Sequence, residues 1–263
     1  MKPTSALLIS TYNWPAALRL VLTSALEQTV KVNEILIADD GSTNETKMLI
    51  EEMQKLSEVP IRHFWQEDSG FRKSKILNKA VADTTVDYII QVDGDCIMHP
   101  KFVEDHLNSL EKGVYLYGSR VNILPDFVAQ VLGNKITHFN FFSKEIKNKT
   151  RSIHFSFFSK LYRPHDGISS KFRGCNVSFW RQDFIDINGY NEDYEGWGRE
   201  DSDLVIRMGN KGVKAKRLRY AGIVYHIHHK INSKHNFELN DKMQDETIAK
   251  KITFIENGVN KYL

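Results

Sequence analysis

The sequence predicts an α/β fold in which helices flank a mostly parallel sheet. Over residues 5–93, short runs rich in β-branched and aromatic residues alternate with stretches whose apolar residues recur at helical spacing. A polar, turn-rich cluster follows each predicted strand. Strands that alternate with helices in this way form βαβ units, and such units build a parallel sheet.

The composition is that of an ordinary globular protein. The chain has 263 residues, of which 41% are hydrophobic and 26% are charged, enough for one large domain with a sizeable core. A formal net charge of +3 is too small to indicate a nucleic-acid partner. Cys96 and Cys175 match no metal-site spacing and predict no disulfide framework, which favours a cytoplasmic location. The apolar run 6–9 is too short for a signal peptide or a membrane span.

Four strands and four helices are expected in the first part of the chain. Pro15 suits the first turn of the first helix, because its fixed φ is already helical. The expected strands are 5–11, 34–38, 61–65 and 87–92, and the expected helices are 15–26, 44–57, a stretch ending at 82, and 101–112.

Because parallel strands end at one edge of a sheet, we expect their polar clusters to meet there. These clusters are Thr11-Tyr12-Asn13, Asp39-Asp40, 68–75 and Asp93-Gly94-Asp95. An acid after the second strand can accept hydrogen bonds from a base or ribose, and Arg72 and Lys75 can meet phosphate charge. Taken alone, Asp39-Asp40 fits a helix-capping turn equally well, and Arg72 and Lys75 fit a solvated helix face better.

A divalent metal is the expected partner of Asp93-Gly94-Asp95. Two acids separated only by glycine repel each other unless a cation lies beside them. The chain also lacks a Gly-rich phosphate loop, so a nucleotide's phosphates would have to be neutralised in another way. A metal on Asp93 and Asp95 would do so.

The segment 133–173 mixes basic and aromatic residues. Its nine lysines and arginines stand against two acids, which gives a local charge of +7. Our first interpretation is a hydrophobic insertion packed on the domain with its lysines in solvent. A peripheral contact with a membrane is the second, and nucleic acid is the least favoured because no recognition motif accompanies the charge.

The stretch Gly196-Trp197-Gly198-Arg199-Glu200-Asp201-Ser202-Asp203 precedes a helix predicted to end near Gly209 or Gly212. Three acids at the start of a helix are stabilised by its dipole. The dipole does not explain a tryptophan between two glycines. A flexible loop that carries an aromatic side chain is suited to stack on a sugar ring and to close over it.

Three histidines follow the strand expected around 213–218. His226, His228 and His229 stand within Val224–Lys230, and on a strand the first two would face the same side while His229 begins to leave it. One histidine here would most often be structural, whereas three favour coordination of a metal. Mixed carboxylate and imidazole ligation suits Mn²⁺, with Mg²⁺ next.

The first half resembles the donor-binding half of the GT-A glycosyltransferases, specifically the inverting glycosyltransferase family 2. The resemblance rests on the clusters at 11–13, 39–42 and 93–95 and covers roughly residues 4–120. It implies a nucleotide-sugar-binding sheet whose Asp-x-Asp holds a divalent metal on the donor diphosphate. Many members carry Ala-Arg-Asn where this chain has Ile76-Leu77-Asn78, so Arg72 or Lys75 would replace the missing arginine. The implied donor-binding residues are Thr11, Tyr12, Asn13, Asp39, Asp40, Arg72, Lys75, Asn78, Asp93 and Gly94.

A second resemblance covers the later part of the chain. Arg173-Gly174-Cys175-Asn176, Gly189-Tyr190 and 197–203 are similar to galactosyltransferase-like enzymes, including animal β-1,4-galactosyltransferases and bacterial chondroitin-type polymerases. This resemblance implies Asp201 as the general base and a histidine metal ligand, for which His226 fits best and His228 stands in reserve. It implies acceptor binding by Trp197, Gly198, Glu200 and Asp201, and the two resemblances together imply metal binding by Asp95, His226 and Asp93.

Together these features predict a metal-dependent inverting glycosyltransferase. It would move a hexose or N-acetylhexosamine from a UDP-sugar to a glycan or lipid-linked acceptor, as in bacterial surface polysaccharide or lipopolysaccharide assembly. The alternative is a non-catalytic nucleotide-sugar or glycan-binding module, whereas a sugar nucleotidyltransferase would need a Gly-rich basic motif near the first strand. The expected parts of one continuous domain are a donor half 1–120, an insertion 121–170, an acceptor half 171–232 and a helical tail 233–263.

Overall fold

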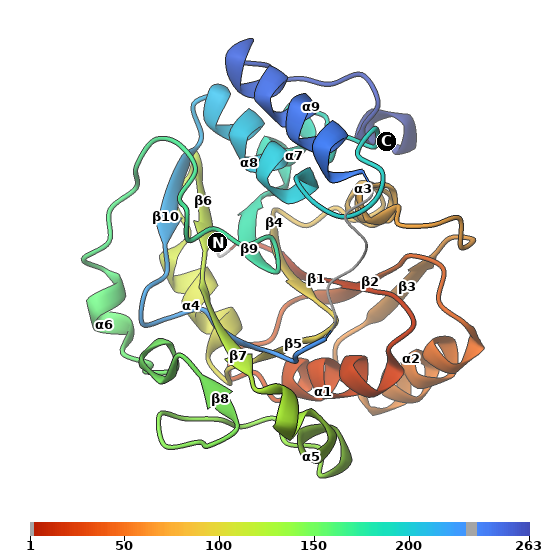
Figure 1. The fold of residues 1–263 in the computed structure, drawn as a ribbon, viewed down its shortest axis with the longest axis vertical. Coiled ribbons are helices and arrows are strands. Elements are labelled where there is room, and N and C mark those ends of the chain that lie inside the picture. The colour runs from red at the N-terminus through yellow and green to blue at the C-terminus, as the bar shows by residue number, and fades with distance from the viewer. Residues whose placement is uncertain (1–2, 230–235) are drawn as a thin grey trace.

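The computed structural model describes residues 3–229 and 236–263 and contains a large and a small sheet (Figure 1). The large sheet is formed by β1 (Ser5–Thr11), β2 (Glu34–Asp39), β3 (Ile61–Trp65), β4 (Tyr88–Asp93), β6 (Val114–Tyr117), β9 (Asn176–Trp180) and β10 (Lys214–Arg217). The small sheet is formed by β5 (Cys96–Met98), β7 (Ser119–Ile123), β8 (Ile146–Lys147) and β11 (Ile223–His226). The helices are α1 (Pro15–Leu26), α2 (Asn44–Leu56), α3 (Lys73–Ala82), α4 (Phe102–Ser109), α5 (Val128–Gly133), α6 (Ser156–Ser159), α7 (Arg181–Asp186), α8 (Glu200–Asn210) and α9 (Phe237–Ala249).

The prediction of a mostly parallel sheet is confirmed. The strand order is β10-β6-β9-β4-β1-β2-β3, in which only β9 runs antiparallel to its neighbours β4 and β6. The chain leaves β1 toward β2 and β3 on one side and returns to β4 on the other. The loops after β1 and β4 therefore diverge, and such a switch point leaves a crevice at the carboxyl ends of the strands.

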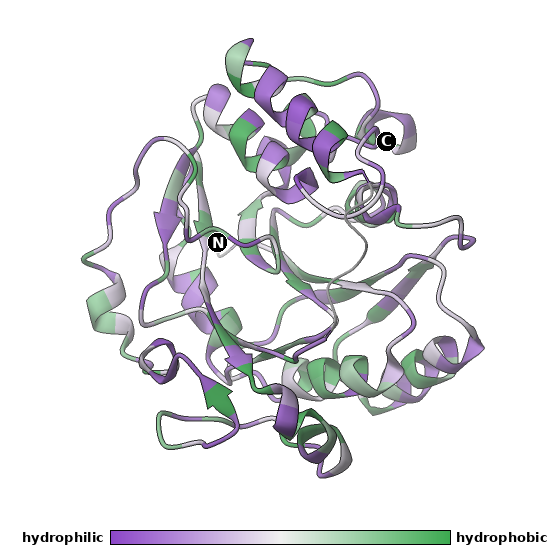
Figure 2. Ribbon diagram, viewed as in Figure 1, coloured by the Kyte–Doolittle hydropathy of each residue, from purple (hydrophilic) through white to green (hydrophobic). Residues whose placement is uncertain are grey.

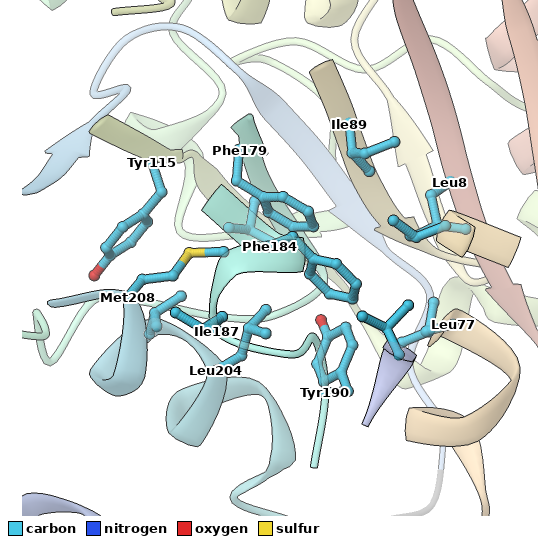
Figure 3. Packing of buried hydrophobic residues seen from close by; sticks show 14 of the residues in the cluster. Leu8, Leu77, Ile89, Tyr115, Phe179, Phe184, Ile187, Tyr190, Leu204 and Met208 are labelled. Carbon is cyan, nitrogen blue, oxygen red and sulfur yellow. The ribbon is translucent and has the colours of Figure 1, made fainter. Parts of the chain in front are cut away.

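The inner strands of the large sheet are buried on both faces, which explains the continuous hydrophobic runs of β1, β2 and β4. Side chains of β1 alternate between the two faces: Ala6 and Leu8 pack toward α3, α7 and α8, whereas Leu7 and Ile9 pack toward α1, α2 and α4. Figure 3 shows the first of these cores, where Leu8 and Ile89 lie near the rings of Phe179 and Phe184. In Figure 2 the hydrophobic residues of α1 are prominent, while α9 is mostly hydrophilic.

The first part of the expected insertion 121–170 belongs to the small sheet. Strands β7 and β8 pair antiparallel, and Val121, Phe139 and Ile146 share a core cluster with residues of β11. The structure thus packs this part of the segment against the domain. The expected boundary between the acceptor half and the tail, at 232 and 233, lies outside the described residues. No helix in the described ranges is long and apolar enough to cross a membrane.

A buried ion pair fixes α8. Arg207 and Asp203 are both fully buried, and Nε of Arg207 lies 2.7 Å from Oδ2 of Asp203. The guanidinium also donates to the carbonyls of Ile187 and Gly189, which anchors the turn after α7. Because Thr247 of α9 donates to the same aspartate, the pair joins α8 to two neighbouring segments.

We predict that Arg207→Met destabilises the protein by roughly 3–5 kcal/mol, because it leaves Asp203 buried without its cation. Lys250→Met is the matched control, since Lys250 and Glu246 form an exposed pair with the same i,i+4 spacing. That variant should lose only about 0.5 kcal/mol or less. Urea unfolding measures both changes, and equal losses in the two variants would contradict the role assigned to Arg207.

Candidate active site

A cavity of about 1710 Å³ opens at the carboxyl ends of β1 and β4. Residues from the two halves of the chain line it together, as the predicted convergence of the strand ends requires. The predicted site residues that line the cavity are Thr11, Tyr12, Asp40, Asp93, Gly94, Asp95, Trp197, Gly198, Glu200, Asp201, His226 and His228.

Two other predicted donor-binding residues, Asn13 and Asp39, do not line the cavity. Asp39 is fully buried, where it accepts a hydrogen bond from the Ser42 N–H and lies 3.0 Å from Nε2 of His63. Asn13 accepts from the Thr43 N–H. These bonds order the turn between β2 and α2, which gives Asp39 a structural role in the turn before the helix.

Asn78 is fully buried in α3, away from the cavity lining. Its amide donates to the Tyr190 carbonyl and to Glu192, and its oxygen accepts from the Tyr190 N–H. Through these hydrogen bonds, Asn78 connects α3 to the loop before α8. Arg72 and Lys75 also do not line the cavity.

Lys73 is the cation that faces the cavity from this region, and the sequence analysis missed it. Its ammonium lies 2.6 Å from Oδ1 of Asp93, which also accepts from the Ser10 hydroxyl at 2.8 Å. Helical spacing alone does not single it out, because Lys73 stands four residues before the buried Leu77 and Arg72 stands four residues before the buried Ile76.

The side chains of Asp95, His226 and His229 form a cluster and lie close enough together to hold a metal ion. Nε2 of His229 lies 3.1 Å and Nε2 of His226 lies 3.5 Å from Oδ2 of Asp95. One ligand atom from each residue falls within 4.8 Å of the others. The antiparallel register of β11 on β5 places His226 opposite Cys96, and this pairing brings the imidazole to Asp95.

The structure places His229, and not the expected reserve ligand His228, beside Asp95. The expectation assumed that the strand continues through His228, but β11 ends at His226. Beyond His226 the side chains no longer alternate between two faces. His229, three residues later, therefore lies on the same side as His226 and contacts Asp95. His228 is exposed and lines the cavity outside the cluster.

The protonation states of the cluster suit a cation. Burial acts to raise the pKa of Asp95, but its hydrogen bond with His229 and the charge of His226 outweigh burial and hold this pKa below its ordinary value. Burial also lowers the pKa of His226, despite the neighbouring carboxylate. At neutral pH the cluster therefore offers an ionised carboxylate and a His226 imidazole with a free lone pair.

Glu200 and Asp201 stand in the first turn of α8. Asp201 accepts hydrogen bonds from the N–H groups of Gly174 at 2.8 Å and Ser202 at 2.7 Å. A Cβ atom on Gly174 would lie 2.4 Å from Cβ of Asp201, so only glycine fits there. These contacts fix the orientation of the Asp201 carboxylate in the cavity.

Glu200 differs from its neighbour in its surroundings. It is 7% exposed and accepts from the Gly198 N–H at 3.2 Å. Burial, followed by the charge of Asp201, raises the pKa of Glu200 to about 7, although Lys73 opposes the shift. Near neutral pH the protonated and ionised forms of Glu200 are therefore both populated.

Trp197 lies in a tightly turned loop on the rim of the cavity. The flanking Gly196 and Gly198 have φ values of +75° and +108°, a region that favours glycine. The indole stacks on the ring of Phe237 with centroids 6.2 Å apart and an interplanar angle of 23°. Phe237 of α9 therefore supports the indole of Trp197, which is expected to stack on a sugar.

Family models match most of the chain. The model of glycosyl transferase family 2 matches residues 6–165, and that of the N-terminal domain of galactosyltransferase matches residues 154–230. Chondroitin synthase of Escherichia coli is 25% identical over 238 residues, which are 84% of this chain and 34% of that protein. Validoxylamine A glucosyltransferase of Streptomyces hygroscopicus subsp. jinggangensis is 24% identical over 228 residues, which are 80% of this chain and 52% of that protein. The chain thus spans about a third to a half of these relatives.

Solved structures share the fold. The mannosyltransferase PcManGT from Pyrobaculum calidifontis, in complex with GDP-Man and Mn²⁺, aligns with a TM-score of 0.64 at 16% identity, over 98% of this chain and 66% of its own. S. aureus TarS 1–349 aligns with a TM-score of 0.62 at 13% identity, over 92% and 64%. At such identity the likeness concerns the fold alone, and it confirms the predicted GT-A fold.

The raised pKa of Glu200 predicts a stability difference that depends on pH. A folded-state pKa of about 7 against an ordinary value of 4.5 means that stability is lost as the pH rises through 7. Glu200→Gln cannot titrate, so relative to wild type it should gain on the order of 2 kcal/mol between pH 5 and pH 8.

Urea unfolding at the two pH values measures this gain. Glu238→Gln is the matched control, because Glu238 is an exposed acid in the first turn of α9. A gain of equal size in both variants, or none in Glu200→Gln, would contradict the electrostatic environment described for Glu200.

Proposed function

The chain belongs to glycosyl transferase family 2, and we propose that it is a metal-dependent inverting enzyme that transfers a hexose or N-acetylhexosamine from a UDP-sugar to an acceptor hydroxyl. The observation that carries the proposal is the meeting, in one cavity, of the cluster of Asp95, His226 and His229 with the oriented carboxylate of Asp201. The acceptor would be a glycan or a lipid-linked glycan.

The cluster's donor set fits a divalent cation, since one carboxylate and two imidazoles suit Mn²⁺ first and Mg²⁺ next. The Mn²⁺ and GDP-Man in the PcManGT structure support this choice. When bound, the cation would stabilise the charge that develops on the departing diphosphate. Asp93, expected as a further ligand, would act through its contact with Lys73, whose ammonium adds positive charge beside the same diphosphate.

Asp201 would take the proton of the acceptor hydroxyl while that oxygen attacks the anomeric carbon from the face opposite UDP. The N–H groups of Gly174 and Ser202 would hold its carboxylate in place during this step. Glu200 would accept hydrogen bonds from the acceptor sugar, and Trp197 would stack on its ring. A single displacement of this kind converts an α-linked donor into a β-linked product.

The cellular setting is part of the proposal. The likeness to chondroitin synthase supports a role in surface polysaccharide or lipopolysaccharide assembly. Cys96 and Cys175 are both buried and unlinked, which supports a reducing, cytoplasmic location.

UDP release from a panel of nucleotide sugars, measured with Mn²⁺ and a soluble acceptor, tests the proposal directly. We expect Asp201→Asn to lower turnover about 10²–10⁴-fold while the dissociation constant for the donor stays unchanged, because only proton transfer is lost. Asp245→Asn, an exposed acid in α9, is the control and should keep full turnover. Binding of the donor without any turnover in the wild type would instead identify a non-catalytic binding module.

Removal of single histidines tests the metal centre. We expect His229→Ala to weaken Mn²⁺ binding at least tenfold, because it removes one of three ligands, while His228→Ala keeps the wild-type affinity. Calorimetric titration with Mn²⁺ in the presence of UDP measures both variants. The reverse order of affinities would restore His228 as the ligand.

A further inference from the structure

Five large apolar side chains are exposed within nine residues, at 153–161. Their exposed fractions are 40% for Ile153, 51% for Phe155, 64% for Phe157, 45% for Phe158 and 69% for Leu161. Single exposed apolar residues are common on protein surfaces, but a contiguous group of this kind marks an interaction surface. We call these five residues the 153–161 patch.

The patch is held firmly on the domain. The N–H of Phe155 donates to the Tyr220 carbonyl at 2.8 Å, and the ring of Phe158 lies 6.0 Å from that of Tyr220. The rings of Phe155 and Phe158 are 4.8 Å apart. Figure 1 shows α6, which carries the two central phenylalanines, at the outer edge of the molecule, away from the large sheet. The aromatic side chains are therefore presented outward by an anchored segment.

Positive charge surrounds the patch. Lys160 lies within it, Arg163 follows it, and the guanidinium of Arg219 lies 4.5 Å from the centre of the Tyr220 ring. Burial, and then the charges of Arg217 and Arg219, lower the pKa of nearby Arg151, so cations crowd this region. Residues 149–163 include no acid. Within the described ranges, no carboxylate pairs with Arg151, Lys160, Arg163 or Arg219.

We propose that the 153–161 patch docks on the surface of an anionic lipid bilayer. Aromatic and aliphatic side chains enter the boundary between headgroups and acyl chains, and lysines and arginines are attracted to anionic headgroups. A second copy of this chain fits less well, because a symmetric contact through the patch would bring its cations against those of the partner.

If the proposed function holds, docking through the patch would also position the cavity for the reaction. Seven residues after Leu161, Ile168 lines the cavity, and the lining continues through Arg173 to Gly174 beside Asp201. Docking through the patch would therefore hold one wall of the cavity near the membrane. The acceptor class that this arrangement favours is a lipid-linked glycan rather than a free one.

Co-sedimentation with vesicles tests the proposal. Wild-type protein should bind phosphatidylcholine vesicles that contain phosphatidylglycerol, bind pure phosphatidylcholine vesicles at least tenfold more weakly, and lose affinity as salt increases. Phe157→Ser combined with Leu161→Ser should weaken binding at least tenfold, because two apolar side chains no longer insert. Lys160→Glu combined with Arg163→Glu should do the same by removing the attraction.

Leu239→Ser combined with Phe254→Ser is the matched control, since these residues are similarly exposed at 59% and 54% but lie outside the patch. It should bind vesicles like the wild type. UDP release with a soluble acceptor should stay unchanged in all these variants, because none of the altered residues lines the cavity. Absence of UDP release in the wild type would overturn the proposed function, but it would not by itself overturn the docking proposal.

Three results of the vesicle experiment would overturn the docking proposal. They are equal wild-type binding to both kinds of vesicle, absence of binding to either, and wild-type affinity in the patch variants. Self-association that Phe157→Ser abolishes would also overturn it, since the patch would then contact a second copy.

Discussion

Repulsion between carboxylates is the constraint on which the rest of the cavity depends. Asp93, Asp95, Glu200 and Asp201 all line the same cavity. Each carboxylate is stabilised in a different way: Asp93 by Lys73, Asp95 by its hydrogen bond with His229, and Asp201 by backbone N–H groups. Glu200 is compensated by partial protonation near neutral pH. Four acids that would otherwise repel one another are thereby kept close to the space where a diphosphate and a sugar would meet.

The fold brings these acids together from distant parts of the chain. The first pair stands at the end of β4, at the switch point of the sheet, whereas the second pair begins α8, more than a hundred residues later. The buried Arg207 and Asp203, six and two residues after Asp201 in the chain, hold α8 in place. The small sheet then supplies His226 through the pairing of β11 with β5. Three separate packing arrangements thus converge on one cavity.

Much of this arrangement could be predicted because its determinants are local. The strands β1, β2 and β4 are buried on both faces, so their apolar runs are continuous, and the polar residues after them mark the sheet edge. The choice among neighbouring residues was not local. Whether Arg72, Lys73 or Lys75 faces inward depends on how α3 packs, and whether His228 or His229 meets Asp95 depends on where β11 ends. The two- to five-residue strands of the small sheet are held by long-range pairing, which short sequence patterns do not reveal.

The close approach of Gly174 to Asp201 links the histories of two positions far apart in the sequence. Any side chain at position 174 would collide with Asp201. A substitution of Gly174 can therefore be tolerated only if position 201 changes as well. Paired substitutions at these two sites should therefore depart from simple additivity. An enzyme engineered for new acceptors would have to vary the surrounding loop while leaving this pair intact.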